Sequence, residues 1–240
     1  MFQAPPTPAA QIVQADADFR AAIAGWDDSQ PLPQAAIDAE RRQQLVELRL
    51  AGDPSLYRVT LAALPPRVRA DVADDVTAHR ELTGIPSKHA TRKPPRIRLG
   101  PALPLATLRG LYREGEQRSS VPWRVLAAIN FVESDFGRLR EPSISGALGP
   151  MQFMPSTWRS YGEGNIRDPR DAILAAARYL RAAGAPRDLR TALWHYNPSS
   201  RYVDAVLRYA RRIARDRFGL ASLYARRLLV KTSAGWRSLD

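Results

Sequence analysis

The sequence predicts a mainly α-helical protein. Apolar residues recur every three or four positions through much of the 240-residue chain, and prolines and glycines separate these stretches at intervals typical of helices. No repeat of fixed period is present. Hydrophobic residues make up 45% and charged residues 25%, as in ordinary globular proteins, and the length allows one substantial core with an appendage or two smaller cores.

The N-terminal part divides into two segments. Residues 1–35 are rich in Pro, Ala, Gln and Asp with weak periodicity, so we expect a flexible leader. Residues 36–85 should form a small helical N-terminal region, because helical patterns are separated by Gly52, by the pair Pro65–Pro66 and by Gly84. The expected helices are 36–50, 54–64 and 66–82.

Residues 86–104 form a basic, proline-rich segment. Five prolines alternate with five Lys or Arg residues, a composition typical of an extended linker. Binding of a polyanion by this segment is the alternative.

Residues 105–216 should form the main helical domain. Its first helix starts at Leu105, and its second follows Ser120 as N-cap and Pro122 in the first turn, ending at Glu133. A short helix should begin near Pro155. Three further helices are expected at 168–184, 189–196 and 200–217, and residues 217–240 form a C-terminal extension with a possible short hairpin.

Glu133 is the candidate catalytic residue. On a helix it shares a face with Asn130, Ile129 and Leu126, so its charged form should be poorly solvated and its pKa raised. An ordinary glutamate pKa of about 4.3 leaves roughly one Glu in 500 protonated at pH 7, whereas a value near 6 protonates roughly one in ten. The alternative is an ordinary glutamate pointing into water at a helix end.

Four segments resemble the signature motifs of the soluble-lytic-transglycosylase (SLT) domain family, in the same order and spacing. They cover roughly residues 105–216 and are Glu133-Ser134-Asp135-Phe136-Gly137, the run from Gly146 through Met151 and Gln152 to Trp158, Asn165 to Pro169, and Ala192 to Ser199. The resemblance implies a lysozyme-like fold of the goose-type lysozyme class. It also implies cleavage of peptidoglycan strands between N-acetylmuramic acid and N-acetylglucosamine.

The resemblance assigns roles to individual residues. Glu133 would be the sole acid/base, and Tyr196 would place its hydroxyl near that carboxylate, with Asn197 supporting the same wall. Met151 and Gln152 would line the saccharide groove. The substrate-binding set implied in full is Ser134, Gly146, Met151, Gln152, Tyr196 and Asn197. The chain departs from the family pattern at Pro198–Ser199 and at Asp135.

The sequence offers no convincing second catalytic carboxylate. Asp135 should face away from Glu133 on a continuous helix, while Asp168 and Asp171 suit an N-cap and a first-turn acid. The family's chemistry accommodates a single carboxylate, with formation of a 1,6-anhydro sugar. A muramidase that uses water, or a non-catalytic binding protein for cell wall or nucleic acid, are the alternatives.

The net charge of +12 favours association with polyanions, although charge alone does not select one. With peptidoglycan as the main partner, we expect anionic wall polymers as further partners and no nucleic acid. Histidines 79, 89 and 195 lack ligand spacing and cysteine is absent, so neither metal nor cofactor is expected. No transmembrane segment and no recognisable signal peptide are visible, yet an extracytoplasmic location is expected, either in the cell envelope or secreted.

Overall fold

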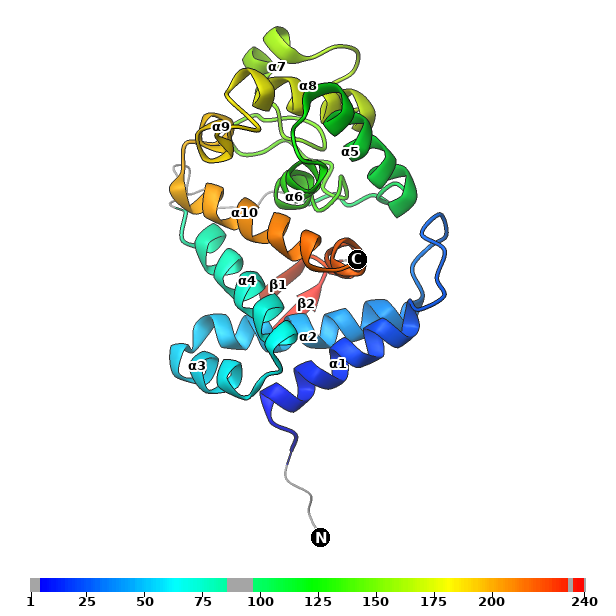
Figure 1. Cartoon of the computed structure of the whole chain (residues 1–240), viewed down its shortest axis with the longest axis vertical. Coiled ribbons are helices and arrows are strands. Elements are labelled where there is room, and N and C mark those ends of the chain that lie inside the picture. The colour runs from blue at the N-terminus through cyan, green and yellow to red at the C-terminus, as the bar shows by residue number, and fades with distance from the viewer. Residues whose placement is uncertain (1–4, 86–96, 233–234, 240) are drawn as a thin grey trace.

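The computed structural model describes residues 5–85, 97–232 and 235–239, and it confirms a mainly α-helical protein. In Figure 1, helices α5 to α9 gather at one end of the molecule, α1 to α4 gather at the other, and α10 lies between them. The helices are α1 (Pro8–Ala22), α2 (Gln34–Gly52), α3 (Pro54–Ala63), α4 (Pro66–Thr83), α5 (Leu105–Ser119), α6 (Trp123–Ser134), α7 (Pro155–Tyr161), α8 (Pro169–Ala182), α9 (Leu189–Tyr196), α10 (Ser200–Arg215) and α11 (Gly219–Ala225).

Residues 5–35 are not a flexible leader, so that prediction is wrong for this segment. Helix α1 starts with Pro8 behind Thr7, whose hydroxyl accepts a hydrogen bond from the Ala10 amide. Its apolar side chains are few, but Ile12 and Phe19 are both buried. Packing of α1 on α2 therefore supplies the stabilisation that the weak periodicity did not indicate.

The predicted helices 36–50, 54–64 and 66–82 are confirmed as α2, α3 and α4 with small differences at their ends. The expected linker at 86–104 falls partly outside the described residues. The end of this segment is hydrogen-bonded to the loop after α6: Leu99 pairs with Leu139, and the Gly100 amide donates to the Arg138 carbonyl. This pairing holds the start of the main helical domain against the loop that follows α6.

The predicted N-cap of α6 is wrong. Ser120 is not the N-cap of α6 but follows the C-terminus of α5 with a left-handed φ of 62°. Helix α6 begins one residue after Pro122, and the Glu116 carboxylate accepts a hydrogen bond from the Trp123 amide. The free amide at the helix start is thus satisfied by a side chain one turn before the end of α5.

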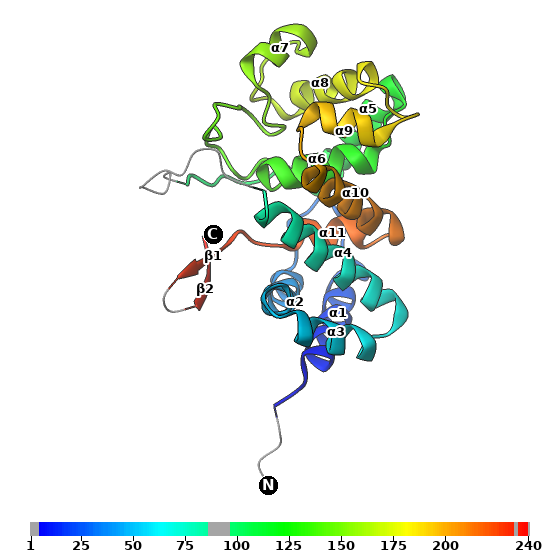
Figure 2. The same cartoon turned by 90° about the vertical axis from the view of Figure 1, so that its left-hand side faces the viewer.

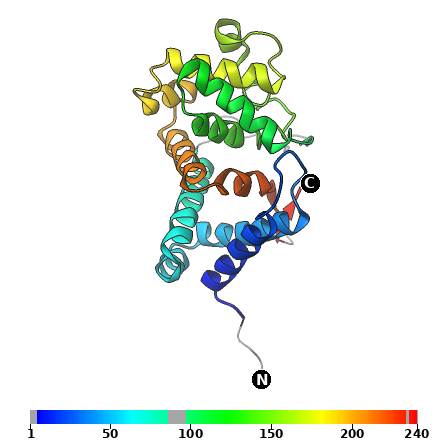
Figure 3. The same ribbon diagram turned by 45° about the vertical axis from the view of Figure 1, so that its right-hand side comes forward.

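The C-terminal segment contains a helix that the sequence did not predict. Helix α11 is largely buried, with Leu223 and Ala225 fully inaccessible. Figure 3 shows it between the α5–α6 helices and the α1–α2 pair. The predicted hairpin is confirmed as antiparallel strands β1 (Leu229–Thr232) and β2 (Gly235–Ser238), which lie at one side of the molecule in Figure 2.

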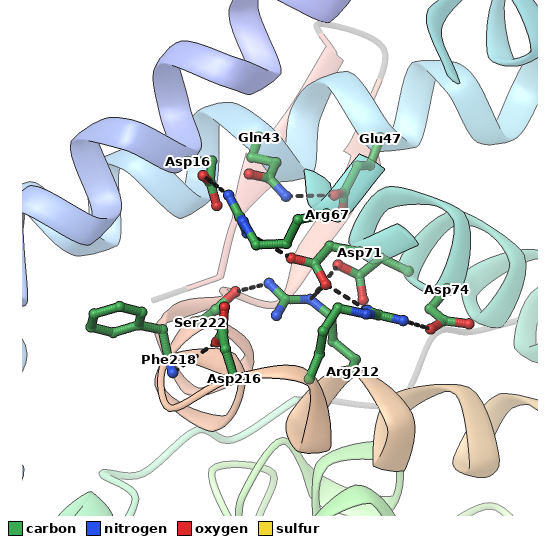
Figure 4. Close-up of polar contacts among 12 residues, drawn as sticks. Asp16, Gln43, Glu47, Arg67, Asp71, Asp74, Arg212, Asp216, Phe218 and Ser222 are labelled. Atoms are coloured by element: carbon green, nitrogen blue, oxygen red, sulfur yellow. Dashed lines mark hydrogen bonds and ion pairs between the residues drawn. The ribbon is translucent and has the colours of Figure 1, made fainter. Parts of the chain in front are cut away.

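Helix α4 joins helix α10 through ion pairs. Arg212 is almost fully buried and lies 3.4 Å from Asp75 and 3.6 Å from Asp71, while its Nη2 donates to the Ser222 hydroxyl (Figure 4). Arg215 donates to Asp71 and Asp74 at 2.5 and 2.6 Å. The N-terminal helices are therefore attached to the main helical domain by buried charges as well as by apolar contacts.

Candidate active site

Glu133 lies near the C-terminal end of α6; its side chain is partly exposed, while its carboxyl group is closely surrounded by protein atoms. The preceding turns contribute fully buried Leu126 and Ile129, as the sequence predicted. Burial raises the pKa of Glu133 to about 7, and a hydrogen bond from Tyr202 lowers the pKa by less than burial raises it. The predicted increase is confirmed. Close to half of these side chains would carry a proton at neutral pH.

The phenol that contacts Glu133 belongs to Tyr202 of α10, a residue to which the motif resemblance gave no role in the site. Its hydroxyl donates to Oε1 of Glu133 at 2.6 Å. The expected partner, Tyr196, instead donates to the Met151 carbonyl oxygen at 2.6 Å. The two phenol rings are nearly parallel with centroids 6.5 Å apart, so Tyr196 flanks the contact without making it.

Both phenols remain neutral near pH 7. Burial raises the pKa of Tyr196 and of Tyr202 well above its ordinary value, and the neighbouring Glu133 charge raises both further. Tyr202 is therefore a hydrogen-bond donor to the carboxylate over the whole range in which Glu133 titrates.

A tight loop approaches the end of α6. Leu148 and Phe153 exchange both backbone hydrogen bonds at 2.9 Å, which closes the four residues between them into a turn. Gly149 has φ +76°, and a Cβ at this position would overlap the Ile166 carbonyl oxygen. Only glycine fits here, because both the backbone angle and the neighbouring chain exclude a side chain.

A buried hydrogen-bond network fastens this loop to α6. The Pro150 carbonyl oxygen accepts from Ser134 Oγ at 2.6 Å and from Asn130 Nδ2 at 2.8 Å. Tyr112 on α5 donates to Asn130 Oδ1 at 2.6 Å. Sequence reasoning missed the role of Asn130, although a polar residue on an otherwise apolar helix face was a signal that could have found it.

This network corrects the role of Ser134. Its side chain is fully buried, and its hydroxyl also accepts from the Gly137 amide at 2.9 Å. It has no surface left for substrate, so it supports the loop and does not bind saccharide.

The side chains of Met151 and Gln152 differ in their exposure to solvent. The Met151 side chain is fully buried, so the expectation that it lines a saccharide groove is wrong for its side chain. Gln152 is partly exposed, adopts a left-handed φ of 48°, and donates from Nε2 to the Gly149 carbonyl at 2.9 Å. Gly146 also has positive φ, but open space surrounds the position of its missing Cβ.

Asn197 is partly exposed at the C-terminal end of α9, beside Tyr196. Its carbonyl accepts from the Ser199 amide at 2.7 Å, and the Ser199 hydroxyl accepts from the Tyr202 amide at 3.4 Å. The Pro198–Ser199 departure from the family pattern therefore supplies the N-cap of α10, the helix that carries Tyr202.

The three candidate second carboxylates are engaged elsewhere. Asp135 lies 3.3 Å from Arg138, and Asp168 caps α8 by accepting from the Arg170 and Asp171 amides. Asp171 accepts from the Asn165 amide at 2.8 Å. The sequence-based assignment of Asp168 as an N-cap is confirmed. Within the described residues, no group of three or more His, Cys, Asp or Glu side chains could hold a metal ion.

The comparisons with known proteins agree with the motifs. Residues 110–217 match the model of the family described as "Transglycosylase SLT domain". Membrane-bound lytic murein transglycosylase F of Thiobacillus denitrificans is 28% identical to the chain over 156 residues. The aligned part is 60% of this chain, and it spans only about 30% of that relative's length. No solved structure matches the chain.

None of the described helices is long and apolar enough to cross a membrane. The helical architecture around Glu133 is the one expected of a lysozyme-like SLT fold, and the motif order, the matched residues and the relative point to the same family. The resemblance predicted from the motifs is thus confirmed: residues 110–217, somewhat less than half of the chain, match the transglycosylase SLT domain family.

Proposed function

We propose that the protein is a peptidoglycan lytic transglycosylase that cleaves the β-1,4 bond between N-acetylmuramic acid and N-acetylglucosamine. The observation that carries the proposal is the Glu133–Tyr202 pair, in which a largely buried carboxyl group has a pKa of about 7 and a neutral phenol donates to one of its oxygens. The family match and the relative's name support this class of substrate.

The contact with Tyr202 gives the two carboxyl oxygens different tasks. Oε1 accepts from the phenol, which leaves Oε2 to carry the proton toward the glycosidic oxygen. Transfer of that proton breaks the bond between C1 of muramic acid and the oxygen of the leaving sugar, while the N-acetyl oxygen supports positive charge at C1. An acid with a pKa near the working pH is well suited to this step.

The second step returns the proton. The Glu133 carboxylate accepts the proton of the C6 hydroxyl group, and O6 bonds to C1 to form the 1,6-anhydro end. Glu133 is then protonated again and no water is consumed. The engagement of Asp135, Asp168 and Asp171 in local contacts supports a mechanism with one carboxyl group.

Groups near Glu133 would contact the glycan. We assign this role to Gln152, Tyr196 and Asn197, which are partly exposed on the segments beside the carboxylate. Gly146 would allow the strand to approach the backbone, since nothing occupies the space beside its Cα atom. An extracytoplasmic location follows from such a substrate, and the relative's name, a membrane-bound murein enzyme, is consistent with it.

Mass spectrometry of digested cell wall tests the proposal. Wild-type protein should release anhydro-muropeptides, whereas Glu133→Gln should release none while folding normally and binding wall. Glu163→Gln is the matched control, because this carboxylate is 80% exposed and, among the described residues, its one ion pair is with Arg178. Reducing ends in place of anhydro ends would identify a muramidase, and normal activity of Glu133→Gln would refute the site.

A further inference from the structure

A hollow with a volume of about 380 Å³ lies where α5, the start of α6 and the end of α10 meet. It is at the opposite end of α6 from Glu133, about 14 Å away along the helix axis at 1.5 Å per residue. Its charged lining residues are Arg109, Arg113, Arg124, Asp216 and Arg217.

Three of these arginines have no carboxylate partner in the part of the chain that the structure describes. Asp28 neutralises Arg109 at 2.7 Å, and Arg20 neutralises Asp216 at 2.6 Å. Among the described residues, no carboxylate lies within ion-pair distance of the other three guanidinium groups, which are all solvent-exposed. These are Arg113, Arg124 and Arg217. Gathering three uncompensated cations around one hollow costs free energy unless an anion joins them.

Aromatic rings hold the three guanidinium groups in place. Arg113 and Arg124 lie 5.6 and 5.1 Å from the centroid of the Trp123 ring, and Arg217 lies 4.6 Å from that of Phe218. Stacking on a ring leaves the N–H groups of a guanidinium free to donate. The cations are thus partly ordered before any ligand arrives.

The same stacking limits the class of ligand. The Trp123 ring is covered by two guanidinium groups, and the Phe218 ring by those of Arg20 and Arg217, which leaves little ring surface for nucleobases. None of the residues lining the hollow belongs to the large exposed hydrophobic residues that could insert into a bilayer. Recognition would depend on charge and hydrogen bonding.

We propose that this hollow binds a phosphate monoester. Such a group presents three terminal oxygens and close to two negative charges, which suits three arginine forks better than the two oxygens and single charge of a carboxylate. The start of α6 is already capped by Glu116, so the arginine side chains supply the recognition. The phosphate could belong to a soluble sugar or polyol phosphate or to a lipid headgroup.

Two sets of substitutions separate a local site from the overall charge of +12. The first replaces Arg113, Arg124 and Arg217 with Gln. The second replaces Arg58, Arg159 and Arg187 with Gln, three exposed arginines without an ion pair among the described residues. Both lower the net charge by the same amount, and thermal unfolding should confirm that both fold.

Titration calorimetry with glycerol 3-phosphate, and with glycerol as a control, measures the soluble ligand. Sedimentation with vesicles of phosphatidic acid, against phosphatidylcholine, measures the lipid source. We expect wild type to bind at least one phosphate probe, the first set to lose at least about tenfold in affinity, or 1.4 kcal/mol, and the second to stay within about twofold. Equal losses in both sets, or no binding of either probe by wild type, would overturn the proposal, as would binding of duplex DNA without binding of either probe.

Discussion

The Tyr202 hydroxyl donates a 2.6 Å hydrogen bond to Oε1 of Glu133 across 69 positions of sequence. This bond lowers the pKa of the carboxyl group, whereas burial raises it to a greater extent. The protonation of Glu133 is therefore set by two opposing effects: burial favours the protonated form, and the hydrogen bond from Tyr202 on α10 favours the charged form.

Replacing Tyr202 with Phe should raise the pKa of Glu133 further, because the bond that lowers it is lost. The decline in rate at alkaline pH should move to higher pH, while kcat falls roughly tenfold as the carboxyl group loses its orientation. A pH–rate profile on cell wall measures both effects. Tyr196→Phe is the control, since its hydroxyl contacts Met151, and an equal displacement of the alkaline limb in this variant would contradict the assignment.

Folding stability should report the pKa of Glu133 independently of activity. The pKa rises from 4.5 in the unfolded chain to about 7 in the folded one, so this residue's contribution to stability is present below pH 4.5 and declines as pH rises toward 7. Relative to wild type, Glu133→Gln should gain at most about 3 kcal/mol in unfolding free energy between pH 4 and pH 8. Urea unfolding at the two pH values tests this, and a pH-independent difference would count against it.

Two glycines of the same loop should respond differently to alanine. Gly149→Ala places a methyl group on the Ile166 carbonyl at a positive φ, and should cost about 3 kcal/mol or more or prevent folding. Gly146→Ala meets open space and should cost only about 1 kcal/mol for its backbone angle. Denaturant midpoints compare the two, and similar losses would show that the overlap is relieved by movement of the loop.

The buried arginine between α4 and α10 should matter far more than an exposed one. Arg212→Met leaves Asp75 and Asp71 short of positive charge, and should cost about 3–5 kcal/mol. Arg190→Met breaks an exposed pair with Asp204, and should cost about 1 kcal/mol or less. Thermal and urea unfolding measure both, and a small loss for Arg212→Met would mean that water or neighbouring arginines compensate.

Local signals predicted most of the helices. The starts of α3 and α8 follow from Pro54 and from Asp168 with Pro169, because these caps and breakers act within one turn. Helices α1 and α11 escaped prediction, since their stability comes from burial against elements distant in sequence.

In the candidate site, too, features set by local sequence could be predicted, and features set by tertiary packing could not. The apolar surroundings of Glu133 are a property of its own helix, so the raised pKa could be predicted. The choice between Tyr196 and Tyr202 depends on how α9 and α10 cross α6, and periodicity contains no such information. Burial of Ser134 and Met151 likewise depends on how the loop folds onto α6, so motif likeness assigned them to the substrate.

The ion pairs between α4 and α10 determine how far the chain can be truncated and still fold. The family match starts at residue 110, yet Arg208, Arg211 and Arg215 of α10 donate to acids of α4, which lies well before that point. Trimming to the matched segment would strip those arginines of their acids and would also remove the buried helix α11, which packs on α10 and α6. The smallest unit that can be expressed and remain folded therefore extends upstream of the recognised homology.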